Sequence, residues 1–108
     1  MIVDTHAHYA PQSMLDALAA GTATFPNVDL LHEGDTWKLG FAGGPLTRPV
    51  NPKLRHPEPR SAWMAEHGID VQVNGGWLDS FGYELPVEEG VARTRFLNEH
   101  LIEGARAV

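Results

Sequence analysis

The sequence contains no cysteine, and this absence removes several classes of site at once. Disulfide scaffolds, thiol nucleophiles and zinc-thiolate centres all require that residue. A transition metal would therefore have to be held by histidine, carboxylate or water. The chain has six histidines, which is enough to build such a site.

Long apolar runs and clustered positive charge are also missing. No apolar run approaches the ~20 residues that a transmembrane helix needs, and the first residues lack the basic and apolar regions of a signal peptide. We therefore expect a cytoplasmic protein with no membrane partner. The formal net charge is -6 and the eight Lys and Arg residues are scattered. This argues against a nucleic-acid partner, because binding to a phosphate backbone needs clustered basic side chains.

The length and composition indicate one small domain. With 108 residues the chain can form a single modest core but not two. A hydrophobic content of 43% is typical of a packed globular protein rather than a disordered one.

A short strand followed by a helix is predicted at the start of the chain. Residues 2 to 8, IVDTHAH, begin with β-branched residues and then alternate, which places Asp4, His6 and His8 on one side of a strand. Pro11 suits the first turn of a helix, and Gly21 suits its end. The predicted buried stripe of this helix consists of Met14, Leu15 and Leu18.

An irregular insertion is expected at about residues 22–57. Within it, VDLLHEGDTWKLGF predicts a hairpin with its turn at Glu33, Gly34 and Asp35. The following stretch, GGPLTRPVNPKLRHPEP, has five prolines, which favours a loop over a helix or a central strand.

Regular structure is expected again after this insertion. PEPRSAWMAEHGID predicts a helix from about Pro59 to His67 that stops at Gly68, and IDVQVNGGW predicts a second strand with Val71 and Val73 on one face. A final helix is predicted from Pro86 onwards. This order is typical of an α/β fold with parallel strands. Because two such strands cannot bury both faces, we expect the chain to be the beginning of a larger fold.

The two histidines of DTHAH carry the clearest chemical signal. Residues two apart in a strand point to the same face with Cα atoms roughly 6.5 to 7 Å apart, so His6 and His8 can converge on one metal ion. A carboxylate two residues earlier, Asp4, can orient a ligating imidazole. The alternative is that both histidines are ordinary polar residues.

Other polar and aromatic residues have weaker signals. Arg48 lies in a loop and is either a clamp for a substrate carboxylate or a solvated charge. Trp77 follows the second strand and either lines a pocket or covers the core. The remaining histidines are interpreted as exposed or helix-capping residues: His32, His56, His67 and His100.

Three segments together resemble a known family. VDTHAHYAP, RHPEPRSAWMAEHGIDVQV and FLNEHL occur in the order seen in the amidohydrolase-related family typified by aminocarboxymuconate semialdehyde decarboxylase. The resemblance covers essentially the whole chain. It implies a distorted (β/α)8 TIM barrel with a divalent metal, usually zinc, at the C-terminal ends of its strands. Such a barrel needs about 250 residues, so residues 1–108 would form its first two βα units plus the hairpin insertion.

The resemblance also implies roles for individual residues. His6 and His8 would be the first two metal ligands, and Arg48 would bind a substrate carboxylate. The catalytic residues are expected beyond residue 108. The implied function is a non-oxidative decarboxylase (a lyase) or a hydrolase of a small carboxylic acid, inactive as this chain alone. A homodimer of the full-length enzyme is left open.

Two other interpretations remain. The chain could be a small non-catalytic α/β module that packs on a partner chain, which would then have to cover its open sheet edge. It could also belong to another barrel hydrolase family with a His-x-His strand. The predicted hairpin and residues 57 to 72 argue against the latter.

Overall fold

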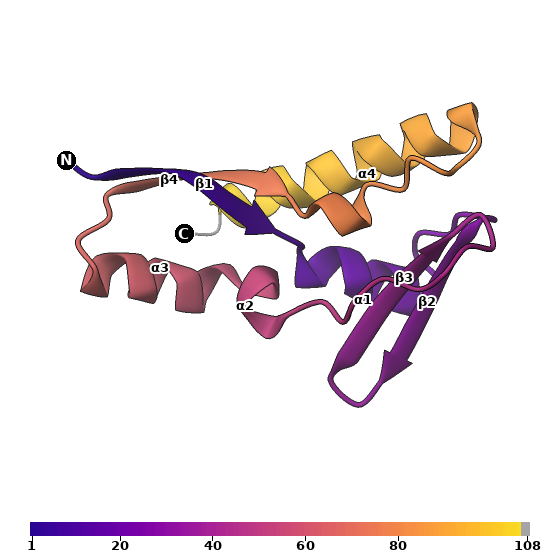
Figure 1. Cartoon of the computed structure of the whole chain (residues 1–108), viewed down its shortest axis with the longest axis horizontal. Coiled ribbons are helices and arrows are strands. Elements are labelled where there is room, and N and C mark those ends of the chain that lie inside the picture. The colour runs from indigo at the N-terminus through magenta and orange to yellow at the C-terminus, as the bar shows by residue number, and fades with distance from the viewer. Residues whose placement is uncertain (107–108) are drawn as a thin grey trace.

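The computed structural model describes residues 1–106 and shows a mixed α/β arrangement (Figure 1). One sheet is a parallel pair of strands, and the other is an antiparallel hairpin. In chain order the elements are β1 (Val3–Tyr9), α1 (Gln12–Ala20), β2 (Val28–Glu33), β3 (Thr36–Phe41), α2 (Pro52–Arg55), α3 (Pro57–Glu66), β4 (Val71–Gly76), the short 3-10 helix η1 (Leu78–Ser80) and α4 (Val87–Arg106).

The parallel pair of β1 and β4 has an irregular register. Asp4 lies opposite Gln72 and Ala7 lies opposite Asn74, so β1 uses three steps where β4 uses two. Paired residues share a face, and alternation along β4 puts Gln72 and Asn74 on the same face. Asp4 and Ala7 therefore share that face, although residues three apart in a regular strand point to opposite faces. The alternation of side chains along β1 is thus shifted by one residue between them.

The two faces of this sheet differ in what covers them. Tyr9 belongs to the face of Ala7, and it is buried where α3 and α4 approach. Alternation assigns His6 and His8 to the opposite face, together with Val71 and Val73. The two valines are 43% and 55% exposed. The helices thus cover one face and leave the histidine face open.

The hairpin forms as the sequence predicts. β2 and β3 pair from Val28 opposite Phe41 to Glu33 opposite Thr36. The following loop runs back along β3, because the amides of Thr47 and Val50 donate to the carbonyls of Leu39 and Trp37, at 2.7 and 2.8 Å.

The turn of the hairpin is attached to the first helices by one buried side chain. Arg55 is only 2% exposed and donates to the carboxylate of Asp35 in the hairpin turn and to Oε1 of Gln12 in α1. The hairpin is therefore attached to the α1 and α2 region by hydrogen bonds as well as by apolar contacts.

Proline and glycine set the helix ends, with one correction. α1 ends at Gly21, which has a φ of 73°, and α3 is followed by Gly68 with a φ of 69°, both as predicted. The prediction that the proline-rich stretch excludes helix is wrong, because Pro52 and Pro57 begin α2 and α3. The first turn of a helix has no intrahelical partner for its N–H groups, so proline fits there at little cost.

The core lies between α1, the hairpin and α4 rather than on the parallel sheet. Its fully buried residues include Met14 and Leu15 from the predicted stripe of α1. The predicted helix from Pro86 corresponds to α4, in which Leu97 is buried but Val87 is 82% exposed. The remaining core residues are Ala10, Trp37, Leu39, Phe41, Val50, Trp77 and Leu85.

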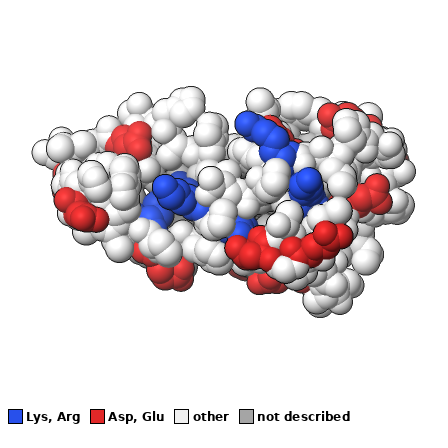
Figure 2. Space-filling view, turned by 60° about the horizontal axis from the view of Figure 1, so that its bottom comes forward, with Lys and Arg blue, Asp and Glu red and all other residues white. Residues whose placement is uncertain are grey.

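Charged side chains of both signs are interspersed on the molecular surface. On the face drawn in Figure 2, the Lys and Arg side chains form separate groups with Asp and Glu nearby. Among residues 1–106, no helix has the length and apolar character needed to cross a bilayer.

Candidate metal and carboxylate site

The imidazoles of His6 and His8 meet on the open face of the parallel sheet. Both residues are exposed, and their ring centroids lie 5.0 Å apart with the planes at 89°. They lie at the C-terminal end of β1, where pairing with β4 is regular from Ala7 onward and irregular just before it. The structure therefore places these two side chains next to each other, as predicted, whereas their convergence on one metal ion and their role as ligands stay predictions.

The hydrogen bond of the His8 ring defines which nitrogen is available. Its Nδ1 lies 3.2 Å from the carbonyl oxygen of Gly76 in β4. A carbonyl can only accept, so Nδ1 carries a proton, and in the neutral ring the lone pair is then on Nε2. This is the tautomer in which a histidine ligates a metal through Nε2 while its other nitrogen is held by the protein.

The predicted role of Asp4 is wrong. The register irregularity separates its face from that of His6 and His8. Its carboxylate accepts from the backbone amide of His6 at 3.1 Å and from Nε2 of Gln72 at 2.9 Å, and not from an imidazole. The hydrogen bond from Gln72, followed by that from His6, lowers the pKa of Asp4. The residue that orients an imidazole is instead Gly76, whose carbonyl has no signature in the sequence.

The other four histidines lie apart from this pair. His32 stacks on Trp37 in the hairpin, His56 precedes α3, His67 contacts the carbonyl of Trp63 at the end of α3, and His100 contacts Ser13. Within residues 1–106, no group of three or more His, Asp or Glu side chains is arranged to hold one metal ion. The described part of the chain thus places no third such side chain beside His6 and His8.

Arg48 and Trp77, both predicted to contact substrate, lie next to each other. The Arg48 guanidinium carbon is 5.9 Å from the centre of the Trp77 ring, and its Nε donates to Asp79 at 3.0 Å. This carboxylate raises the pKa of Arg48, first through the hydrogen bond and then through its charge. The Arg48 side chain is 75% exposed, whereas Trp77 is 8% exposed and belongs to the core.

The Arg48 and Trp77 pair is at the same end of the parallel sheet as the histidines. Trp77 directly follows Gly76, the partner of the His8 ring, and its amide donates to the carbonyl of Tyr9 at 3.2 Å. The Nη atoms of Arg48 form no hydrogen bond with residues 1–106. They present the pair of donors that a carboxylate accepts in a bidentate fashion.

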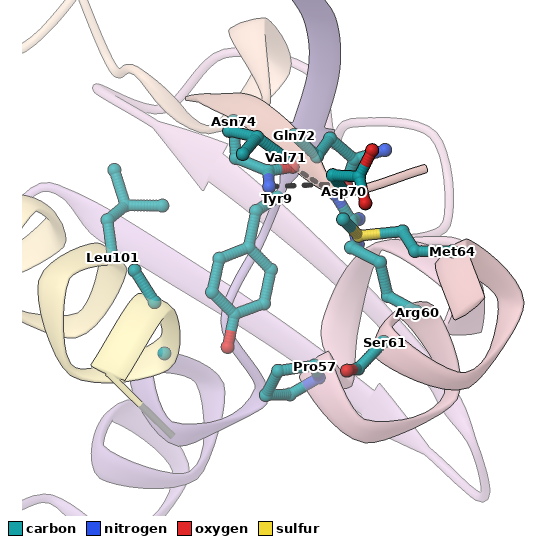
Figure 3. Close-up of a pocket in the computed structure, with 12 residues that line it drawn as sticks. Tyr9, Pro57, Arg60, Ser61, Met64, Asp70, Val71, Gln72, Asn74 and Leu101 are labelled. Carbon is teal, nitrogen blue, oxygen red and sulfur yellow. Dashed lines mark hydrogen bonds between the residues drawn. The ribbon is translucent and has the colours of Figure 1, made fainter. Parts of the chain in front are cut away.

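A cleft of about 360 Å³ lies on the other face of the sheet, between β4, α3 and α4 (Figure 3). Arg60 crosses from α3 to the sheet, and its guanidinium carbon lies 5.6 Å from the centre of the Tyr9 ring. Burial lowers the pKa of Arg60 and raises that of Tyr9. The sequence analysis includes Arg60 only within the resembling segment RHPEPRSAWMAEHGIDVQV and gives it no role, because a single arginine in the first turns of a helix does not reveal its tertiary contacts.

No protein-family model matches the chain, and no curated protein matches it either. Its function is therefore inferred from the residues of the site and from the resemblance of its motifs to the amidohydrolase-related family.

Proposed function

We propose that the chain is the N-terminal part of a metal-dependent (β/α)8 barrel enzyme, in which His6 and His8 are the first two ligands of a divalent metal, most simply zinc. The observation that carries this proposal is the 5.0 Å approach of two exposed imidazoles at the C-terminal end of β1. Catalytic residues in barrel enzymes lie at that end of the strands. Non-oxidative decarboxylation or hydrolysis of a small carboxylic acid is the activity that the motif resemblance favours.

The distribution of the helices supports this assignment. In a (β/α)8 barrel the helices cover the outer face of the strands, and side chains rich in Val, Ile and Leu fill the interior. Here α3 and α4 approach only the face of Tyr9, whereas Val3, Val71 and Val73 are exposed on or beside the histidine face. These valines are the residue type that packs inside a barrel, and His6 and His8 would project into the same space.

The donors present fit a zinc ion. Neutral imidazole nitrogen is a preferred zinc ligand, and catalytic zinc sites use three protein ligands with one open position. When bound, a divalent metal supplies Lewis acidity and makes water a stronger acid. With two ligands from residues 1–106, we expect weak binding, with a dissociation constant above about 1 µM.

Arg48 is the residue best placed to bind a substrate carboxylate. Its Nε is held by Asp79 while its Nη atoms face no acceptor among residues 1–106, and Trp77 supports the guanidinium plane. The ion pair thus orients the Arg48 side chain through Nε and leaves the two Nη atoms available to a substrate carboxylate. We propose that the substrate carboxylate binds there, with its reacting carbon toward the histidine pair.

Zinc titration of the 108-residue chain tests the metal site. The change in the histidine ring signals in NMR spectra gives the affinity for the wild type and for His6→Ala/His8→Ala. We expect the double variant to lose the binding, and His56→Ala/His67→Ala, which removes the same number of imidazoles elsewhere, to retain it. Equal affinity in all three proteins would refute the proposal, as would submicromolar affinity of a monomer.

The open apolar face also supports a second candidate, a non-catalytic module that packs on a partner chain. Ile2, Val3, Val71 and Val73 are each 43% or more exposed, and a parallel sheet is normally covered on both faces. The two proposals differ in how the chain behaves alone. A module should stay soluble with a sharp thermal transition, whereas part of a barrel should unfold in a broader transition and aggregate as the protein concentration rises.

A further inference from the structure

Arg60 is the side chain that connects α3 to the parallel sheet. No residue of α3 is buried, and the cleft of Figure 3 separates much of this helix from β4. Across this gap, Nη1 of Arg60 donates to Oε1 of Gln72 at 3.2 Å and to Oδ1 of Asn74. Nη2 donates to the backbone carbonyl of His8 at 2.5 Å and to that of Lys53 at 3.3 Å.

One guanidinium therefore holds both strands at the end where the metal site is proposed. It contacts β1 at the carbonyl of His8 and β4 at the side chain of Asn74. The relative position of the strands also sets the distance between the His8 ring and its partner, the carbonyl of Gly76. The contact of Arg60 with His8 lies just after the stretch of β1, between Asp4 and Ala7, in which pairing with β4 is irregular.

We infer that Arg60 is a positioning residue for the metal pair. It fixes the backbone of His8 from the helix side, and through the alignment of β1 with β4 it fixes the orientation of the His8 ring toward His6. The inference rests on the proposed metal function of His6 and His8. It adds a residue on the opposite face of the sheet that does not touch the metal.

The charge of Arg60 and its positioning contacts would change the zinc affinity in opposite directions, so the direction of the change distinguishes the two effects. A cation near a zinc site repels the metal, so removal of the charge alone would strengthen binding. Loss of the positioning contacts would weaken it, because supporting contacts behind metal ligands typically change affinity 10- to 100-fold. A purely structural role would lower the thermal stability of the chain and leave the zinc affinity unchanged.

The experiment is zinc titration of Arg60→Gln and Arg60→Lys in the 108-residue chain, followed by the histidine ring signals. We expect the dissociation constant to rise about tenfold in Arg60→Gln. Arg60→Lys should be intermediate, because lysine keeps the charge but lacks the planar fork that reaches both strands. Arg95→Gln removes the same charge from an exposed position of α4 and should change the constant less than twofold.

Each outcome bears on one proposal or both. Unchanged or tighter binding in Arg60→Gln, with the wild type binding through His6 and His8, would overturn the positioning role alone. Absence of histidine-dependent binding in the wild type would overturn both proposals. If Arg60→Gln does not fold, Arg60→Lys decides: weaker binding supports the inference and wild-type affinity refutes it.

Discussion

Two glycines of α4 give a direct test of how this helix meets the sheet. A Cβ placed on Gly104 would lie 2.7 Å from Cζ of Tyr9 and closer still to Cε2 and the hydroxyl oxygen of that ring. Carbon atoms in contact prefer about 3.5–4.0 Å, so Gly104→Ala must displace a ring that is 8% exposed. A Cβ on Gly90 would have Leu85 as its nearest neighbour, at 3.9 Å, which is an ordinary contact.

The two substitutions should therefore change stability in opposite directions. Replacing glycine by alanine within a helix gains up to about 1 kcal/mol of helix propensity, and Gly90→Ala, in the first turn of α4, should show part of this gain. Overpacking costs about 1–3 kcal/mol, so Gly104→Ala should be destabilised by about 0.5–2 kcal/mol after the smaller gain near the helix end. For a chain of this size, 1 kcal/mol corresponds to about 4–8 °C in Tm.

Urea and thermal unfolding followed by far-ultraviolet circular dichroism would measure both variants beside the wild type. The double variant Gly104→Ala/Tyr9→Leu is the matched control, because the smaller side chain should relieve part of the clash. A Gly104→Ala protein as stable as Gly90→Ala would refute the close approach of α4 to Tyr9.

Two further predictions concern buried or paired arginines. The hydrogen bonds and charge of Arg55 lower the pKa of Asp35 below its usual 3.8, so the stabilisation from this pair is present above that pH and is lost as the pH falls below it. The Tm difference between wild type and Asp35→Asn should thus be constant near neutral pH and shrink below about pH 4 in thermal scans; a difference independent of pH would contradict the pairing. Arg93 is fully buried, its one acceptor among residues 1–106 is the carbonyl of Ser80, and burial lowers its pKa to about 10. Because charge is costly there, Arg93→Met should raise the free energy of unfolding by about 1–2 kcal/mol in urea titrations, and a loss of more than that amount would show that the contacts with Phe41 and Phe96 outweigh the desolvation.

Local signals predicted most of the secondary structure. The end of α1 at Gly21 and the hairpin turn at Gly34 follow from backbone conformations that favour glycine, since both have positive φ. Such positions depend on a few neighbouring residues, so the sequence specifies them directly. The helix α2 was missed, and α3 was expected from about Pro59 instead of Pro57, because five prolines were interpreted together, although Pro52 and Pro57 individually occupy first-turn positions.

The candidate site was predictable only where it depends on local alternation. The two imidazoles lie next to each other at the C-terminal end of β1, as expected for residues two apart in a strand, although the irregular register between Asp4 and Ala7 includes His6. The face of Asp4 depends on the register between β1 and β4, which are about 68 residues apart in the chain. The contacts of Gly76 and Arg60 with His8 depend on the same pairing. No local pattern encodes such tertiary contacts.

The positions of polar and apolar residues on β4 connect the site with the open face. Gln72 and Asn74 face the helices, where Arg60 satisfies them, whereas Val71 and Val73 face outward. If the uncovered face were to remain in water, the polar side chains of β4 would be expected on it, pointing away from the helices. The observed arrangement is the opposite. It is the expected pattern if the valine face is to be buried, since each valine buried from water contributes roughly 1.5–3 kcal/mol. The histidines occupy the same face, so whatever covers the valines also lies beside the histidine pair and can complete its coordination.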